Sequence, residues 1–336
     1  MEVGPDGAIR GQVRQTGHWR VLHGLYRVET RHLSPWENFL LDLSALRMVL
    51  PEDAVFTHVT AARLLGWQLP ALPQQVPFFV AVRSENRPRR PGLVCSRLTH
   101  EARTGVVHGL PVDAPAEILL RAARDLGELD LAIMVDSAAR LGHLDEEAID
   151  EVLASRRPGT RLLRKVWLSR DARSESAGET LLRRFHESME VATESQVDLH
   201  DDAGRFIARA DLIVSGTKQV HEYDGAGHRT PKVHRHDLRR ERALVNHGYA
   251  RRGYTLDDLL NHAGVRDERA GPAARALAAG PPTPGVAQPR ARLPLRTRRP
   301  RAGDEPVVPV HHPRRLVTNC MIRSRFPAVW DQTAAP

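Results

Sequence analysis

The stretch from Ala208 to His228 constrains the fold most, because it places three acidic residues on two short strands. ARADLIV and KQVHEYDG have the length and apolar content of strands, and a Ser-Gly-Thr spacer joins them. Asp211 lies on the first strand. Glu222 and Asp224 lie on the second, where the two-residue period puts them on one face. If the strands pair, the three carboxylates gather at one place.

Such a gathering predicts a cation site for phosphodiester hydrolysis. That reaction needs an activated water and stabilisation of negative charge, and bound Mg²⁺ supplies both. Mg²⁺ takes one or two carboxylates and keeps several waters. We therefore expect Asp211 and Glu222 to bind Mg²⁺ or Mn²⁺, with Asp224 as a third ligand or a group that orients the water. His228 is placed to transfer a proton or contact phosphate.

The helix expected next, TPKVHRHDLRRERALVNHGY, is rich in arginine and ends at Gly248. We expect Arg235, Arg239 and Arg240 to contact a nucleic-acid backbone or stabilise developing charge, because guanidinium groups bind phosphate well.

The acidic residues also have ordinary structural interpretations. Asp211 is placed to pair with Arg209, and Asp224-Gly225 is a common turn dipeptide. A lone histidine such as His228 is most often solvated. The set favours a cation site more than any member does, because three acids on adjacent strands are costly without a cation.

Glu179 has two interpretations that are compatible in part. Ser176 and Glu179 show the S-x-x-E spacing of a capping box at the start of the helix ETLLRRFHESM. In that role they satisfy exposed backbone amides. Alternatively, Glu179 belongs to the acidic site as a ligand or a substrate-orienting group.

The basic character of the chain belongs to its tail. The net charge is +8, but from Arg266 onward 13 Arg face 5 acidic residues, and the first 265 residues hold 36 of each sign. Charge alone therefore does not indicate a nucleic-acid partner for the folded part. Half of the 24 prolines lie in residues 266–336, where hydrophobic periodicity ends. We expect this tail to be disordered, and a frame-shifted extension is an alternative.

The chain predicts a cytoplasmic protein with no membrane partner. No apolar run approaches the roughly 20 residues of a membrane span, and the first residues lack the apolar stretch of a secretory signal. Cys95 and Cys320 are far apart, which favours neither a disulfide framework nor a zinc site.

Residues 1–33 predict a short helix over 9–16 and a hairpin over 18–28 that turns at Gly24. Helix and hairpin together are typical of the end of a winged-helix domain, which needs about three helices. The segment is either a partial winged helix or an ordinary surface hairpin. Residues 34–172 alternate helices and short strands before becoming mainly helical, without a catalytic constellation.

The order of motifs over residues 173–260 resembles the endonuclease-like domain of unknown function related to very-short-patch-repair endonucleases. The motifs are S-x-x-E, A-D-L-I-V, E-Y-D-G-x-x-H and D-x-x-R-E-x-x-L-x-x-x-G, and they fall on Ser176, Glu179, Asp211, Glu222, Asp224, His228, Asp237, Arg240 and Gly248. The resemblance implies the restriction-endonuclease-like fold of the PD-(D/E)xK superfamily. It also implies metal ligands at Asp211 and Glu222 and accessory roles for Glu179, Asp224 and His228.

The upstream part resembles the AbiEi-type antitoxin region, on WRVLHGLYR, THVTAARLLG and GLPVDAPA. This resemblance implies DNA binding by the hairpin and a possible cognate toxin as partner. Asp113, Glu117 and Arg121 depart from the pattern, in which Thr, Arg and Asp are usual.

The endonuclease-like part departs from its family at several positions. Asp224 stands where the broader superfamily has lysine, as is normal in this subgroup, and Ala210 replaces the usual proline. Arg251 and Arg252 replace apolar residues of the last strand, and Gly253 replaces its arginine. We expect these changes to weaken the strand and reduce activity.

The sequence thus predicts a mixed α/β (α+β) chain with a restriction-endonuclease-like sheet flanked by helices. Its expected parts are a partial winged helix (1–33), an antitoxin-like middle (34–172), an endonuclease-like domain (173–265) and a disordered tail (266–336). The leading function is Mg²⁺-dependent DNA cleavage. The alternatives are a non-catalytic, antitoxin-like DNA-binding regulator and a degenerate gene product.

Overall fold

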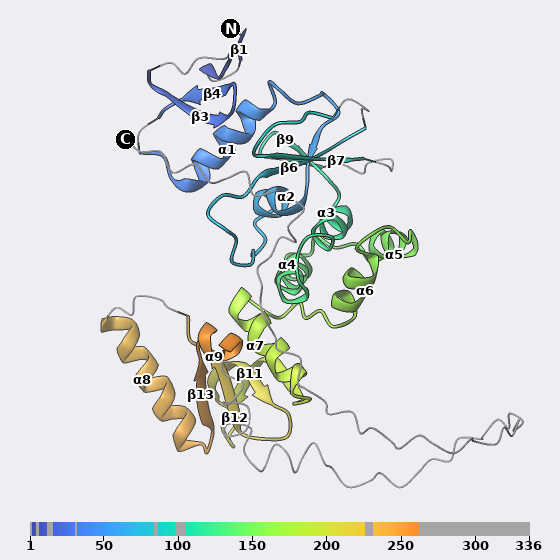
Figure 1. Ribbon diagram of the computed structural model, residues 1–336. Helices are drawn as coiled ribbons and strands as arrows, with labels where there is room; N and C mark the ends of the chain where they lie inside the picture. Colours follow the sequence, from blue (N-terminus) through green and yellow to red (C-terminus); the bar gives the residue numbers. More distant parts are fainter. Residues whose placement is uncertain are drawn as a thin grey trace, which may run out of the picture.

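The computed structural model describes residues 2–4, 7–11, 16–30, 32–83, 87–98, 105–225 and 231–261, with the backbone alone for 2, 231–238 and 261. These residues form three sheets and nine helices (Figure 1), so the mixed α/β class is confirmed. His228 and the expected disordered tail lie outside the described residues, as does the side chain of Arg235. Among the described residues, no helix combines the length and apolarity that a membrane span requires.

The front sheet is antiparallel and packs on the first helix. Its strand order is β1-β2-β4-β3, and its strands are β1 (Glu2–Val3), β2 (Ile9–Arg10), β3 (His18–Leu22) and β4 (Leu25–Val28). Helix α1 (Pro35–Leu46) packs on β3 and β4. The expected hairpin over 18–28 is confirmed as β3 and β4. The helix expected over 9–16 is wrong at its start, because Ile9 is a buried strand residue paired with Tyr26.

The second sheet has the order β7-β6-β5-β9-β8 and mixes parallel and antiparallel pairs. Its elements are β5 (Val55–Phe56), α2 (His58–Leu64), β6 (Phe78–Val82), β7 (Leu93–Arg97), β8 (Gly105–Val107) and β9 (Leu110–Val112). Thr57 is the N-cap of α2, but its hydroxyl makes no capping bond. It donates instead to Asp113 Oδ2 at 2.9 Å.

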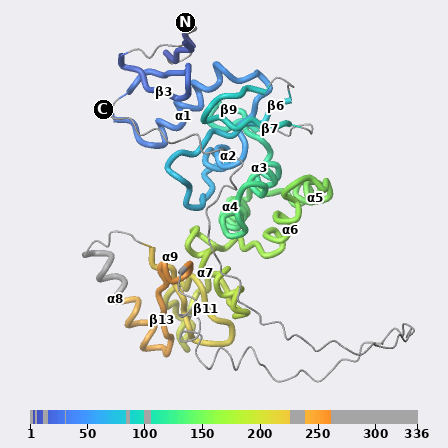
Figure 2. Tube along the Cα trace, viewed as in Figure 1, coloured from blue at the N-terminus to red at the C-terminus, as the bar shows by residue number. Residues whose placement is uncertain are grey.

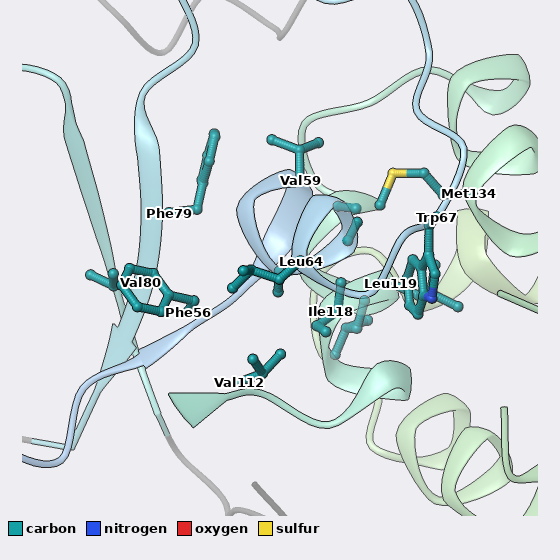
Figure 3. Packing of buried hydrophobic residues seen from close by; sticks show 14 of the residues in the cluster. Phe56, Val59, Leu64, Trp67, Phe79, Val80, Val112, Ile118, Leu119 and Met134 are labelled. Atoms are coloured by element: carbon teal, nitrogen blue, oxygen red, sulfur yellow. The ribbon is translucent and has the colours of Figure 1, made fainter. Parts of the chain in front are cut away.

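The main core joins this sheet to the helical middle region. Figure 3 shows Phe56 and Val80 from paired strands on one side of Leu64 of α2, and Ile118 and Leu119 of the next helix on its other side. The helices that follow are α3 (Pro115–Ala122), α4 (Glu128–Arg140), α5 (Glu146–Ala154) and α6 (Thr160–Leu168). The same core includes Leu22 and Leu25 of the front hairpin, so the hairpin is built into the fold.

The departures from the antitoxin-like pattern form internal ion pairs. Arg121 Nε lies 2.9 Å from Asp113 Oδ2, and both side chains are almost fully buried. Arg157 donates to both carboxylate oxygens of Glu117, at 2.5 and 2.9 Å. Each unusual charge therefore has an opposite partner, which removes most of the cost of burying it.

The third sheet carries the predicted site. Its order is β10-β11-β12-β13, with antiparallel pairs except for the parallel pair β12–β13. The elements are α7 (Ala177–Ser188), β10 (Thr193–His200), β11 (Phe206–Val214), β12 (Gln219–Tyr223), α8 (Pro231–Asn246), β13 (Ala250–Tyr254) and α9 (Leu256–Asn261). Helix α8 contacts β11 and β13, whereas α7 contacts β10, β11, β12 and α9. Two hydrophobic clusters cover the two faces of the sheet.

Helix α7 belongs to both the middle region and this last sheet, and Figure 2 shows it between α4 and β11. The link to α4 is polar. Asp136 of α4 is 1% exposed and accepts hydrogen bonds from Thr180 Oγ1 at 3.0 Å, Arg183 Nη2 at 2.7 Å and the Asp171 amide at 2.9 Å. The helix that begins near Glu179 is therefore fixed to the scaffold by a buried network.

Candidate functional site

The predicted pairing of the two acidic strands is confirmed. In the β11–β12 ladder, Leu212 lies opposite His221 and Ile213 opposite Val220. One step further along this register lie Asp211 and Glu222. The antiparallel pairing of the strands therefore brings together the two residues that the sequence proposes as metal ligands.

Strand β11 changes the face that it presents at Asp211. Ala208 and Ala210 pack with Leu244 of α8, whereas Leu212 packs with Leu182 of α7. Regular alternation would put all three on one face. Across the strand pair, Gln196 of β10 has a positive φ of 55°, and the paired register omits it. The pairs on either side, Ser195 with Leu212 and Val197 with Ala210, keep the same register, so the change of face occurs at Asp211 without a register shift.

Asp211 is a half-buried carboxyl among like charges. Burial raises its pKa most, and the nearby carboxylates of Glu179 and Glu222 raise it further, to about 6. The Arg240 guanidinium and the backbone N–H of Tyr223 act in the opposite direction. In the described part of the chain, no Lys or Arg forms an ion pair with Asp211.

Glu222 is buried and held by two arginines. Its side chain is 5% exposed, Arg240 Nη2 pairs with Oε1, and Arg251 Nε pairs with Oε2. Arg240 also donates to the carbonyl of Arg209 at 2.5 Å, which anchors α8 to β11. The sequence predicts a nucleic-acid contact for Arg240, and the structure places its guanidinium on the acidic cluster. Arg239 is exposed.

Asp224 lies beside Glu222 and shares its arginine. Arg251 Nη2 lies 3.2 Å from Asp224 Oδ1, and the Asp224 amide donates to the Tyr254 carbonyl at 2.8 Å. A Cβ on Gly253 would lie 1.9 Å from Asp224 Oδ2. Gly253 is therefore required by the position of the Asp224 carboxylate, which occupies the space that a side chain would fill.

Glu179 caps its helix and faces the site at the same time, as both interpretations proposed. Ser176 Oγ accepts from the Glu179 amide at 3.2 Å, and the Glu175 amide donates to Glu179 Oε2 at 2.8 Å. Gln196 Nε2 donates to the same oxygen at 2.8 Å. The influence of Glu179 on the pKa of Asp211 places it within electrostatic reach of the cluster.

The sequence missed Gln196, Arg251 and a buried histidine pair. His186 Nε2 lies 2.6 Å from His221 Nδ1, and Tyr254 Oη lies 3.4 Å from the same nitrogen. Burial lowers the pKa of both imidazoles, that of His221 to about 3. This pair fixes β12 to α7 beneath the acidic cluster. In the sequence, Arg251 stands two residues before Gly253, so the two share one face of the strand. That spacing points to Glu222 only once the parallel register of β12 and β13 is known.

The donor set suits a hard divalent cation. A divalent ion would neutralise carboxylates gathered in this way, where burial and then the charges of Glu179 and Glu222 raise the pKa of Asp211. Oxygen is also the donor that Mg²⁺ and Mn²⁺ prefer. In the conformation described here, no group of three His, Cys, Asp or Glu among the described residues lies close enough to hold a metal ion. A cation at Asp211 and Glu222 therefore requires Glu222 to give up one guanidinium contact.

Comparisons with protein-family models, with curated proteins and with solved structures find no match to this chain.

Proposed function

We propose that this protein is a Mg²⁺- or Mn²⁺-dependent DNA endonuclease-like protein whose last sheet is a restriction-endonuclease-like domain. The observation that carries the proposal is the convergence of Glu179 and Glu222 on the half-buried Asp211, whose pKa is raised to about 6 by burial first and then by these two carboxylates. Strongly perturbed acids with a specific set of charged neighbours are typical of functional sites.

The residues of the cluster take distinct roles in this proposal. Asp211 and Glu222 would hold the metal, which when bound supplies an activated water and stabilises charge on the phosphoryl oxygens. Arg240 orients Glu222 and adds positive charge near the place of a DNA phosphate. Glu179, fixed by Ser176 and Gln196, keeps the negative potential at Asp211. Asp224 stays an accessory group, because Arg251 occupies one of its oxygens.

A second candidate is a non-catalytic, antitoxin-like DNA-binding regulator, with a possible toxin as partner. The observation that favours it is the pair of arginines at Glu222. Arg251 donates a hydrogen bond to Oε2, and Arg240 forms an ion pair with Oε1 without a hydrogen bond. In this reading the arginines replace a metal permanently. DNA binding would then depend on the front hairpin, where Trp19 is 49% exposed and Arg20 is also exposed.

Plasmid nicking by the full chain separates the two candidates. With Mg²⁺ or Mn²⁺, the wild type should nick supercoiled DNA, and Asp211→Ala should reduce the rate by about a hundredfold or more. Asp198→Ala is the matched control, because Asp198 lies on the same sheet with a side chain 58% exposed. Equal nicking by the wild type and Asp211→Ala would point to a contaminating nuclease and sink the catalytic proposal.

The regulator makes a different prediction. It should bind DNA without nicking it, and a Trp19→Ala, Arg20→Ala double variant should lose that binding. Point variants are preferable to removing residues 1–33, because Leu22 and Leu25 belong to the main core and their loss would destabilise the fold.

A further inference from the structure

Arg251 lies on the edge strand β13 in a register that directs it at the acidic cluster. In the parallel β12–β13 pair, Arg251 is opposite Val220 and Gly253 is opposite Glu222. Residues two apart on a strand share a face, so Arg251 and Gly253 face the same side as Val220 and Glu222. The Arg251 side chain therefore extends along the sheet by only two residues, from the level of Val220 to that of Glu222, to meet the carboxylate.

The guanidinium of Arg251 has two carboxylate acceptors. Its Nε pairs with Glu222 Oε2, and its Nη2 lies 3.2 Å from Asp224 Oδ1. Asp224 can lie there because Gly253 has no side chain. Arg240, the other partner of Glu222, is tied instead to the backbone carbonyl of Arg209. Of these two arginines, Arg251 is the one that can leave Glu222 and keep a carboxylate partner.

The cluster keeps a net negative charge even with Arg240 and Arg251 in place. Four carboxylates, those of Glu179, Asp211, Glu222 and Asp224, face the two guanidinium groups of Arg240 and Arg251. With all groups ionised, two negative charges remain among these six residues. One divalent cation would neutralise them, but Glu222 Oε2 is taken by Arg251.

We propose that Arg251 is a positioning residue that sets the divalent-cation affinity of this site by competing with the cation for Glu222 and retaining Asp224 as its second acceptor. The inference rests on the proposed function only in taking Asp211 and Glu222 as the cation ligands. Arg251 stabilises the metal-free form of the cluster. It therefore makes cation binding weaker than the carboxylates alone would allow.

Calorimetric titration of the full chain with MnCl₂ tests this directly, without DNA and without activity. Arg251→Gln should bind Mn²⁺ at least about tenfold more tightly than the wild type, because the buried Glu222 carboxylate loses its competing guanidinium. Arg252→Gln is the charge-matched control. It removes the same charge from the next position on β13, opposite His221 and on the other face, and should change the affinity by less than about threefold.

The outcomes are distinct. Equal or weaker Mn²⁺ binding by Arg251→Gln overturns the proposal, as does an equal gain in both variants, which would show a general charge effect. If Arg251→Gln does not fold, as judged by circular dichroism, Arg251→Lys serves. Lysine keeps the charge but loses the two-pronged contact, so its affinity should still exceed that of the wild type, and an unchanged or lower affinity refutes the idea.

The failure of this inference can be distinguished from failure of the proposed function. If the wild type nicks DNA in an Asp211-dependent manner but Arg251→Gln binds Mn²⁺ no better, the competition is wrong and the nuclease stands. If no variant binds Mn²⁺, both the competition and the cation site are wrong. If Arg251→Gln binds tightly and nothing nicks DNA, the competition holds and the catalytic proposal fails.

Discussion

Replacing Asp211 by Asn should stabilise the protein, because the carboxylate is held where its charge is unfavourable. The pKa of Asp211 rises from 3.8 to about 6, chiefly through burial and then through Glu179 and Glu222. That shift corresponds to about 3 kcal/mol between the charged and neutral forms. Asp211 is only partly buried, so solvent screening reduces the expected gain to about 1–2 kcal/mol. The Asn side-chain oxygen can still accept the hydrogen bond from the backbone N–H of Tyr223.

The sign of the pH dependence follows from the raised pKa. Below pH 3.8 the carboxyl is protonated in both the folded and the unfolded chain, so it costs nothing. As pH rises through the interval up to about 6, the unfolded chain ionises while the folded chain retains its proton, and stability falls. Above that the full cost is present. Asp211→Asn should therefore gain most at pH 8 and about half as much at pH 5.

Urea unfolding at the two pH values, in the presence of a chelator, measures this difference. Asp198→Asn is the control, since Asp198 is exposed on β10 and its replacement should change the free energy of unfolding by less than about 0.5 kcal/mol. Adding Mn²⁺ should stabilise the wild type and not Asp211→Asn. A lower free energy of unfolding for Asp211→Asn at pH 8 would refute the like-charge argument.

Three further variants test the surroundings of the cluster. Gly253→Ala should cost about 1–3 kcal/mol of stability and displace Asp224, because its Cβ would lie 1.9 Å from Oδ2; thermal unfolding measures the loss, and an unchanged melting temperature contradicts it. Asp136→Ala should cost about 3–5 kcal/mol, since it removes the buried acceptor shared by Arg183 Nη2, Thr180 Oγ1 and the Asp171 amide; a loss as small as that of the exposed control Asp198→Ala would show that the network is unimportant. Arg157→Ala should cost about 1–3 kcal/mol by leaving Glu117 buried without its arginine, with Arg173→Ala on the surface as the control in the same urea assay.

The local pattern of the sequence predicted the hairpin at the centre of the site. Alternation placed Glu222 and Asp224 on one face, and the apolar content of ARADLIV fixed the first strand, so the meeting of Asp211 and Glu222 followed once the strands paired. The cap at Ser176 is equally local, since its partner is three residues away. Contacts of this kind depend on the spacing of residues a few positions apart, and that spacing can be read from a single sequence.

Contacts made across the sheet were not predictable in the same way. Arg251 looked like a defect in a buried strand, yet β13 forms a five-residue parallel ladder with β12 and turns the arginine towards Glu222. Its role depends on which residue of β12 it faces, and no local spacing specifies that register. The helix expected over 9–16 failed for a related reason: pairing of Ile9 with Tyr26 overrides the helical pattern.

The stability of Asp211→Asn also bears on the choice between the two proposed functions. A regulator that binds DNA through its front hairpin gains nothing from a half-buried carboxylate beside Glu179 and Glu222, and its fold would be better served by a neutral residue there. A cation-binding site needs that charge. The carboxylate lowers the stability of the metal-free protein, and binding of the ion to the folded state restores that stability. A variant that gains stability and loses Mn²⁺ binding together would therefore favour the enzyme. A variant that gains stability while DNA binding and Mn²⁺ response stay unchanged would favour the regulator.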